Sequence, residues 1–469
     1  MLEILVAILA IFYLILACYR LDWAVLMIIF GLPTYLLRFS VLGVPMTILE
    51  TMILISFVVW LVKLFWPLKF NFIRYLKDRD QHLAYPFKYE IILFLVIALA
   101  ALATAHFSPS ALGVFKAYFL EPLLVFILVV NTFLKRGVNK ILWALTLSAL
   151  AVSLLAIYQK ITGQLIPNEF WANVETRRVT SFFGFPNAVG LYLAPLILVM
   201  MGFLGERWKH LKSAKNILKA GLITVTIILS LLAVYFAQSE GALIGIAAAL
   251  FVYGVLVNRR IRVATIVATV ALTVGIISYQ PAFNYVKAKV TLNDLSGQIR
   301  KQQWIETKKM LVAGNWFWGT GLSGYQAAIA PYHQEGIFVQ TGEPNWLEMI
   351  RNDASFRAAH WQPTEIYMYP HNILLNFWTE LGLLGMILMI WLMGKYFVWG
   401  LRIYSLQVKS KKNNRFVILG LTTAMVAIVV HGLVDVPYFK NDLSVMFWLF
   451  LALMGLFNIY RQKHLRNNN

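Results

Sequence analysis

The feature that most limits the fold is a series of apolar runs, including 221–237 and 374–392. There are about a dozen of them, each roughly 17 to 25 residues long, which is the length a helix needs to cross a hydrocarbon core of about 30 Å. Charged residues make up only 13% of the chain, against about 25% in soluble domains. The period-two alternation of an outer-membrane barrel is absent. We therefore predict an all-α, polytopic helical membrane protein with about 12–13 transmembrane helices.

The net charge of +20 could by itself indicate nucleic-acid binding. The basic residues, however, gather in short segments between the apolar runs, as the positive-inside rule describes for cytoplasmic loops. These segments are 69–88, 135–140, 207–219, 259–262, 409–415 and the end of the chain from Arg461. The charge therefore predicts an orientation and a contact with anionic membrane lipids, and no nucleic-acid partner.

Placing the basic segments on the cytoplasmic side fixes the topology by alternation. The predicted spans are 2–18, 23–39, 46–66, 90–106, 117–134, 141–159, 187–204, 220–238, 240–257, 262–279, 372–393, 416–433 and 443–461. They number thirteen, or twelve if the first two do not both cross. We expect 1–279 to hold the N-terminal transmembrane helices, 280–370 a large periplasmic loop with an interfacial helix, and 371–469 the C-terminal transmembrane helices with a cytoplasmic tail.

The long outer loop, 280–370, is too large to be a simple connection, and loops of such length are usually functional. Ser296 can cap a helix that runs to about residue 312. On this helix Arg300, Trp304 and Lys308 recur every four residues and share one face. A basic and aromatic face suits an anionic sugar lipid. The alternative is an interfacial helix whose cations reach the lipid headgroups.

A second outer segment places Arg177 and Arg178 shortly before a span. Two guanidinium groups can hold a diphosphate through paired hydrogen bonds, and Asn187 can cap the helix that follows. The alternative is a membrane-flanking loop whose arginines contact headgroups.

His371, followed by Asn372, stands where the long loop returns to the membrane. A helix start disfavours an imidazolium, so His371 can serve as a neutral base, although a histidine at a membrane boundary can equally be an interfacial residue.

His431 and Asp435 lie four residues apart near the outer end of a later span. Ionisable groups at membrane depth are functional candidates, but these two could also satisfy each other.

Several further charged residues lie near the outer face. Glu240 occupies a tight outer turn between two spans, where it is either a site group or a solvated residue. Arg38, Glu50, Lys116 and Glu121 are candidates for lining the same cavity.

Other kinds of chemistry are not indicated. Cys18 is the one cysteine, so neither an internal disulfide nor a cysteine-based metal site can form. Asp78 and Asp80 match an Asp-X-Asp metal motif formally, but the basic stretch around them predicts a cytoplasmic position. The sequence contains no His-Glu-X-X-His motif, P-loop or dinucleotide fingerprint. We therefore expect a reaction on a preactivated donor without metal, nucleotide or other cofactor.

Four blocks in this order resemble the O-antigen ligase superfamily, which also contains O-antigen polymerases and protein O-oligosaccharyltransferases. The blocks are Arg178…Gly184…Asn187, Ser239-Glu240-Gly241, Arg300…Trp304 with Gly319-Thr-Gly321, and His371-Asn372 with Gly382 and Gly385. Glu240 departs from the pattern, because the family has an arginine there near the donor diphosphate. Arg178, Arg38 or Lys116 could supply the missing charge.

The resemblance implies a helical fold like that of the C-type glycosyltransferases, in a bacterial inner membrane with the active site facing the periplasm. It implies an undecaprenyl-diphosphate-linked glycan as donor and transfer to an acceptor hydroxyl with inversion at the anomeric carbon. His371 would then be the catalytic base, and Arg300 would hold the diphosphate. The implied substrate-binding residues are Arg178, Arg177, Asn187, Trp304, Asn372, Arg38, Lys116 and Glu240.

The sequence leaves the acceptor open. Lipid A-core would make the protein a lipopolysaccharide ligase, a second lipid-linked glycan would make it a polymerase, and a protein side chain would make it an O-oligosaccharyltransferase. Outside this class, a transporter or flippase of lipid-linked sugars is the main alternative, although the halves of the chain do not mirror each other as they often do in transporters. A structural membrane scaffold is a third possibility.

Overall fold

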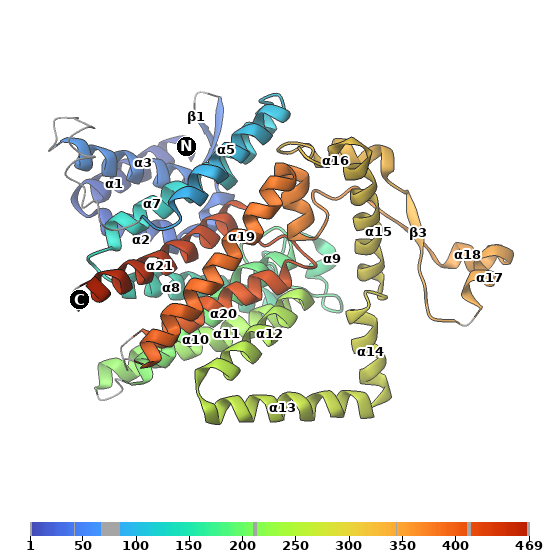
Figure 1. Cartoon of the computed structure of the whole chain (residues 1–469). Helices are drawn as coiled ribbons and strands as arrows, with labels where there is room; N and C mark the ends of the chain where they lie inside the picture. Colours follow the sequence, from blue (N-terminus) through green and yellow to red (C-terminus); the bar gives the residue numbers. More distant parts are fainter. Residues whose placement is uncertain are drawn as a thin grey trace.

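The computed structural model describes residues 2–41, 43–66, 85–209, 213–343, 345–409 and 414–466. Within these ranges the protein is mainly helical with very little sheet, which confirms the predicted all-α class (Figure 1). Asp78 and Asp80, the formal metal motif, lie outside the described residues.

The helices of the first half are α1 (Leu2–Tyr19), α2 (Leu21–Phe30), α3 (Ile48–Phe65), α5 (Lys88–Thr104), α6 (Pro109–Phe115), α7 (Glu121–Phe133), α8 (Asn139–Thr162), α9 (Glu169–Ala172) and α10 (Pro186–Trp208). Those of the second half are α11 (Ala214–Phe236), α12 (Glu240–Val257), α13 (Arg259–Ser278), α14 (Gln280–Val290), α15 (Leu295–Met310), α16 (Tyr325–Ile329), α17 (Trp346–Asn352), α18 (Ala354–Ala359), α19 (Ile373–Lys409), α20 (Arg415–His431) and α21 (Asn441–Arg466).

Short elements complete the described chain. Two antiparallel hairpins pair β1 (Arg38–Val41) with β2 (Val44–Thr47), and β3 (Gly336–Phe338) with β4 (Trp361–Pro363). Single turns of 3₁₀-helix are η1 (Leu32–Leu36) and η5 (Ala330–Tyr332), and π-helical turns are η3 (Lys116–Leu120) and η4 (Leu311–Asn315).

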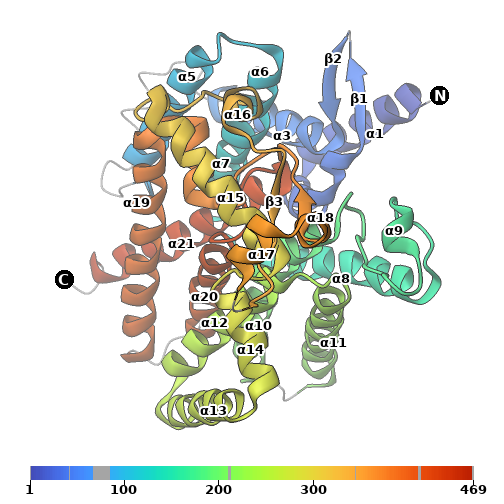
Figure 2. The same cartoon turned by 90° about the vertical axis from the view of Figure 1, so that its right-hand side faces the viewer.

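Each of the thirteen predicted spans overlaps a helix. Across the described residues, nine helices are long and apolar enough to cross a membrane, and α1, α2 and α20 contribute shorter apolar stretches. The protein is therefore a polytopic helical membrane protein. In Figures 1 and 2 the segment between α13 and α19 gathers at one end of the bundle, which we call the loop end.

The second predicted span, 23–39, differs from the structure. Helix α2 ends at Phe30, and the chain continues as the 3₁₀ turn η1 and strand β1. Ten helical residues are about 15 Å long, half of a hydrocarbon core. The helix stops because Gly31 caps it and Pro33, at the start of η1, has no N–H to continue the ladder.

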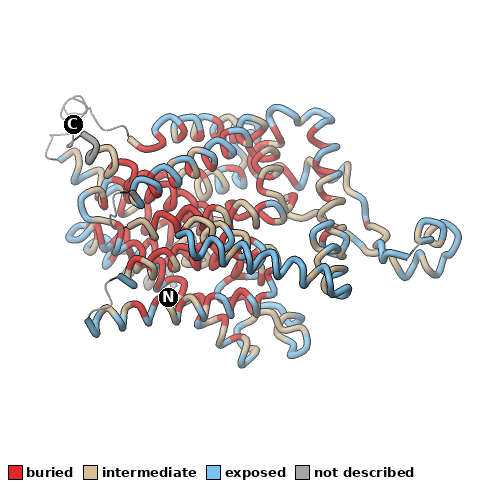
Figure 3. The backbone as a smooth tube through the Cα atoms, turned by 60° about the horizontal axis from the view of Figure 1, so that its bottom comes forward, coloured by how far each residue is buried: buried red, intermediate tan, exposed pale blue. Residues whose placement is uncertain are grey.

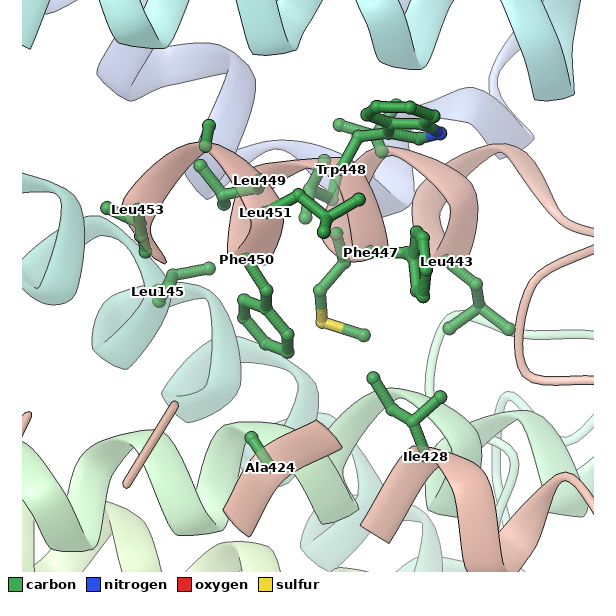
Figure 4. Close-up of a cluster of buried hydrophobic side chains, with 14 of the residues drawn as sticks. Leu145, Ala424, Ile428, Leu443, Phe447, Trp448, Leu449, Phe450, Leu451 and Leu453 are labelled. Carbon is green, nitrogen blue, oxygen red and sulfur yellow. The ribbon is translucent and has the colours of Figure 1, made fainter. Parts of the chain in front are cut away.

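Helix α21 forms the centre of the bundle. Its side chains, among them Phe447, Trp448 and Phe450, pack against Ile428 of α20 and Leu145 of α8 (Figure 4). In its apolar window 94% of the residues are buried by protein. Helix α13 is the opposite case, since none of its residues is buried (Figure 3). Both helices are equally apolar, so one serves as a protein core and the other faces lipid.

The long loop is anchored to the bundle where α19 is broken. Gly382 interrupts α19 with a φ of 74°, and a Cβ there would lie 2.3 Å from the carbonyl oxygen of Phe317. Gly319 makes the reciprocal approach, since its Cβ would lie 2.3 Å from the Thr379 carbonyl oxygen. Gly319 of the Gly-X-Gly block and Gly382 of the Gly-X-X-Gly block thus allow the loop backbone and the α19 backbone to approach closely, because neither residue has a Cβ.

Glu380 strengthens this anchor. Its Oε2 accepts a hydrogen bond of 2.7 Å from the backbone N–H of Ser323. The carboxylate therefore holds the loop and does not orient His371.

Candidate functional site

Five segments meet at the loop end of the bundle. They are the residues before α10, the turn between α11 and α12, helix α15, the start of α19, and the connection between α20 and α21 (Figures 1 and 2). Helix α20 packs on both α10 and α12. A Cβ on Gly241 would come within 2.6 Å of the His431 ring, so the start of α12 lies directly against that histidine.

His371 is held firmly at the start of α19. The side chain of Asn372 caps the helix by accepting hydrogen bonds of 3.0 and 3.1 Å from two first-turn N–H groups. It also donates to the carbonyl of Leu433, 3.1 Å away, and Ile373 N–H donates to Gly432 over 2.8 Å. Asn372 therefore positions its neighbour, and its predicted contact with substrate stays a prediction.

Asp435 lies between two histidines. Its Oδ1 is 3.6 Å from Nδ1 of His371, slightly too long for a hydrogen bond, and its Oδ2 is 3.9 Å from Nε2 of His431. Burial would raise the pKa of Asp435, but the two imidazoles outweigh it and hold that pKa well below its usual range. The expected pairing of His431 and Asp435 thus extends to His371. An ionised carboxylate on the Nδ1 side favours a proton there and leaves Nε2 of His371 to accept one.

Arg178 joins two of the converging segments, the residues before α10 and the turn between α11 and α12. Its guanidinium donates to the carbonyls of Ala237 and Gln238, over 3.0 and 3.3 Å, and to Oδ1 of Asn187 over 3.1 Å. Burial lowers the pKa of Arg178, with Glu240 acting in the opposite direction. The group still carries its charge at neutral pH, because a guanidinium has a reference pKa above about 12.

The side chains of Asn187 and Arg177 make other contacts than those predicted from the sequence. Asn187 does not cap α10, because Phe185 occupies the cap position and the Asn187 side chain accepts from Arg178. Arg177 points toward the preceding loop, where it donates to the carbonyls of Lys160 and Ala172. The structure thus brings Arg178 and Asn187 to the site and gives Arg177 a role in the fold of its own loop.

Lys440 is a site residue that the sequence interpretation did not single out. Its Nζ lies 3.6 Å from the centre of the Phe185 ring and forms no ion pair within the described part of the chain. Burial lowers the pKa of Lys440 to about 8, against the attraction of Asp442 and Asp435. A partly buried cation without a direct counter-ion is a candidate for binding an anion. The sequence feature that could have indicated Lys440 is its position five residues after Asp435, at the start of an apolar span.

Helix α15 brings Trp304 to the same place. The indole N–H of Trp304 donates a 2.8 Å hydrogen bond to the carbonyl of Pro370, the residue before His371. Helix α15 begins at Leu295, and Ser296 lies inside its first turn, so Ser296 does not supply the predicted cap. Trp304 therefore braces the loop helix against the chain that leads to the histidine.

Arg300 reaches the site from the same helix. Its Nη1 donates to Ser296 Oγ over 3.2 Å. The charge of Arg300 also acts on the phenol of Tyr367. Burial and Glu365 raise the pKa of Tyr367, and Arg300 opposes that rise. The ring of Tyr367 in turn meets the ring of His371 edge-on, with centroids 5.2 Å apart. Arg300 and His371 thus share Tyr367 as a neighbour, and Arg300 is partly exposed.

Glu240 already has a cationic partner. Its Oε2 is 2.7 Å from Nζ of Lys289, and Tyr285 donates to its Oε1 over 3.3 Å. Lys289 also pairs with Asp294, 2.9 Å away. The glutamate therefore ties the start of α12 to α14 and the start of α15.

Arg38 and Lys116 lie in a separate group beside the β1–β2 hairpin. Nζ of Lys116 is 2.8 Å from Oε1 of Glu50 and donates to the carbonyl of Pro45 over 3.1 Å. Arg38 acts electrostatically on Tyr118. No contact joins these two cations to His371 within the described ranges, so their part in the same cavity stays a prediction.

A comparison with known proteins finds a family similarity in the middle of the chain. Residues 225–390 match a family model described as O-antigen ligase. No curated protein matches the sequence. The matched segment contains Glu240, helix α15 and His371, whereas Arg178, Asp435 and Lys440 lie outside it. This segment of the chain is therefore similar to the O-antigen ligase family, in agreement with the resemblance carried by the ordered motifs.

Proposed function

We propose that this protein is a membrane glycosyltransferase that moves a glycan from an undecaprenyl-diphosphate carrier to an acceptor hydroxyl. The observation that carries the proposal is the grouping of His371 and its carboxylate partner Asp435 with three cations, Arg178, Arg300 and Lys440. A base beside several cations suits a reaction in which a proton is taken up and a diphosphate leaves.

In the proposed step, the acceptor oxygen attacks the anomeric carbon while its proton passes to Nε2 of His371. The bond between that carbon and the phosphate oxygen breaks, and its electron pair leaves with the diphosphate. Direct displacement inverts the anomeric configuration. Arg300, Arg178 and Lys440 stabilise the charge that builds on the leaving group, and Asp435 stabilises the imidazolium. The step uses no cofactor, and we propose that it is independent of metal.

The proposal places the reaction on the periplasmic side of a bacterial inner membrane. The positive-inside distribution supports that orientation, because the loop end lies opposite the described basic residues 135–140 and 207–209 (Figure 1). The chemistry is the same for a lipid A-core, glycan or protein acceptor, so the acceptor decides between ligase, polymerase and protein glycosylation. We propose the ligase reaction first, because the matching family model is described by it.

The test uses purified protein in detergent with an undecaprenyl-diphosphate glycan, candidate acceptors and EDTA. We expect transfer by the wild type, its loss in His371→Ala and a smaller but clear reduction in Arg300→Ala. Matched controls are His360→Ala and Arg351→Ala, which lie in the same loop on or next to α17 and α18, away from the site. Size-exclusion profiles and thermal unfolding establish that each variant is folded.

Three outcomes would overturn parts of the proposal. Full activity in both site variants would remove His371 and Arg300 from the chemistry. Loss of transfer with EDTA, restored by a divalent cation, would show that the reaction needs a metal. Passage of labelled lipid across vesicles without modification of any acceptor would favour the transporter.

A further inference from the structure

The long loop contains a cleft on the side of α15 that faces away from the bundle. This loop cleft has a volume of about 720 Å³. It is lined by Asn293, Gln298, Lys301, Gln302, Ile305, 334–338, Gln340, Trp346 and Trp361. In Figure 1, α15 stands between the bundle and strand β3, so the cleft and the His371 site lie on opposite sides of one helix.

The helical repeat explains this separation. Gln298, Lys301, Gln302 and Ile305 follow the spacing of a single helix face. Arg300 lies two positions from Gln302, which is about 200° round the helix. One surface of α15 therefore serves the candidate catalytic site, and the opposite surface forms one wall of the loop cleft.

The other wall carries an aromatic surface. Trp361 is 44% exposed, and its ring lies 5.0 Å from that of Phe338. Gly336 lets the indole lie across strand β3, because a Cβ there would approach Trp361 to 2.4 Å. Trp346 is fixed by a hydrogen bond of 3.1 Å from its indole N–H to the carbonyl of Val339.

Polar groups surround this surface, and they fall into two sets. The side chain of Gln298 is fully engaged, since it accepts from Gln340 N–H over 2.8 Å and donates to the carbonyls of Asn293 and Gln340. By contrast, the side chains of Gln334, Glu335 and Gln340 have no hydrogen-bond partner within the described residues. The first set fixes the shape of the cleft, and the second is free to bind a ligand.

This combination fits one class of ligand. A sugar ring has an apolar face of C–H groups that packs on an indole, and hydroxyl groups at its edge that pair with amide donors and acceptors. A concave site with aromatic walls and a few free polar groups is a usual ligand site. The lining of the cleft carries one cation and one anion, Lys301 and Glu335, so it offers an anionic lipid no net positive charge.

We propose that the loop cleft binds a neutral segment of oligosaccharide, away from the glycosidic bond that reacts. The inference rests on the proposed function, because the glycan is the group that the reaction transfers. A site on the far side of α15 would hold the glycan chain while its reacting end lies near His371. It would also make transfer depend on the length of the glycan.

The first test measures binding without catalysis. The probe is the glycan released by mild acid from the lipid-linked glycan of the source cells, labelled at its freed reducing end. Fluorescence anisotropy with the full-length protein in detergent gives its affinity. We expect Trp361→Ala to bind about tenfold more weakly, within the range that aromatic contacts contribute, and Gln334→Ala to bind several-fold more weakly.

Two controls separate the loop cleft from its surroundings. Trp318→Ala removes another exposed tryptophan of the loop that does not line the cleft, and it should bind as the wild type does. His371→Ala should also bind normally, because it alters only the opposite side of α15. No binding by the wild type, or equal binding by Trp361→Ala and Gln334→Ala, would overturn the proposal.

The second test identifies which substrate occupies the cleft. In transfer assays, Trp361→Ala should raise KM for a donor with many sugar units and leave KM for a single-unit donor unchanged. A rise in KM for the acceptor alone would assign the cleft to the acceptor glycan. Unchanged KM values for both would overturn the inference. Glycan binding without any transfer would support the cleft while contradicting the proposed reaction, so the two failures are distinguishable.

Discussion

The candidate site is built from two regions that are held in different ways. On the bundle side, Asp435 is buried and His371 is fixed by the cap of α19 and the connection between α20 and α21. On the loop side, Arg300 is partly exposed, and its one hydrogen bond within the described residues is to Ser296 on its own helix. Near His371, the loop helix α15 is linked to the start of α19 by the hydrogen bond from Trp304 to Pro370, the residue before the histidine.

This difference corresponds to two chemical requirements. Proton transfer needs a base in a fixed position and tautomer, which a buried carboxylate and a capped helix provide. Binding a diphosphate needs positive charge nearby, and a charge acts over a longer range than a hydrogen bond. We therefore expect substitutions on the bundle side to reduce the rate more than substitutions on the loop side.

Apart from loss of the base itself in His371→Ala, the largest effect is expected for Asp435→Asn. Loss of the carboxylate removes the group that orients and stabilises the imidazole of His371, so kcat should fall about a hundredfold, at the lower end of general-base contributions. KM should stay nearly constant, because Asp435 is a positioning residue. Steady-state transfer assays measure both constants, with Asp353→Asn in the loop as the matched control. A change in KM alone would show that Asp435 acts on substrate binding.

Lys440→Met should have the next largest effect. A hydrogen bond to a charged group contributes about 1.5–3 kcal/mol, so kcat/KM should fall about twentyfold. Because burial lowers the pKa of Lys440 to about 8, the amine is charged below that pH and neutral above it. Wild-type kcat/KM should therefore decline above pH 8.

A pH profile of Lys440→Arg sharpens this prediction. A guanidinium stays charged throughout that range, so the alkaline decline should disappear in this variant. An unchanged decline would show that another group titrates there.

Trp304→Phe tests the contact between the two regions. The substitution keeps an aromatic ring and removes the 2.8 Å hydrogen bond to Pro370, which is worth about 1 kcal/mol. We expect kcat to fall about fivefold, because the loop helix is less well placed. Trp378→Phe is the matched control, since it loses a similar bond, to the Trp316 carbonyl, outside the site. A loss above that of Asp435→Asn would reverse the ranking of the two regions.

The sequence predicted the helical class and the positions of the apolar helices, apart from the second span, because apolar length is a local property. It could not predict which apolar helix is buried by protein. Helices α13 and α21 have hydropathy values of 2.0 and 1.9, yet 0% and 94% of their windows are buried. That difference depends on tertiary packing, which hydropathy does not record.

The sequence predicted only part of the candidate site, because contacts between distant segments also depend on tertiary packing. His371, Arg300, Trp304 and Arg178 were recognised from ordered motifs, and the structure brings them to one end of the bundle. The approach of Asp435 to His371 joins residues 64 positions apart, and no local pattern encodes it. Lys440 was missed because its importance depends on burial against Phe185, a residue from a distant segment.

The smallest effect is expected for Glu240→Gln. This carboxylate pairs with Lys289 at 2.7 Å, but its side chain is 46% exposed, and exposed ion pairs contribute only about 0.2–1 kcal/mol. Transfer should therefore fall about twofold at most, and Glu240→Gln with Lys289→Met together should cost little more than either alone. If Glu240→Gln instead reduced kcat as far as Asp435→Asn, the glutamate would act on the reacting groups. The loop side would then be as closely coupled to the chemistry as the bundle side.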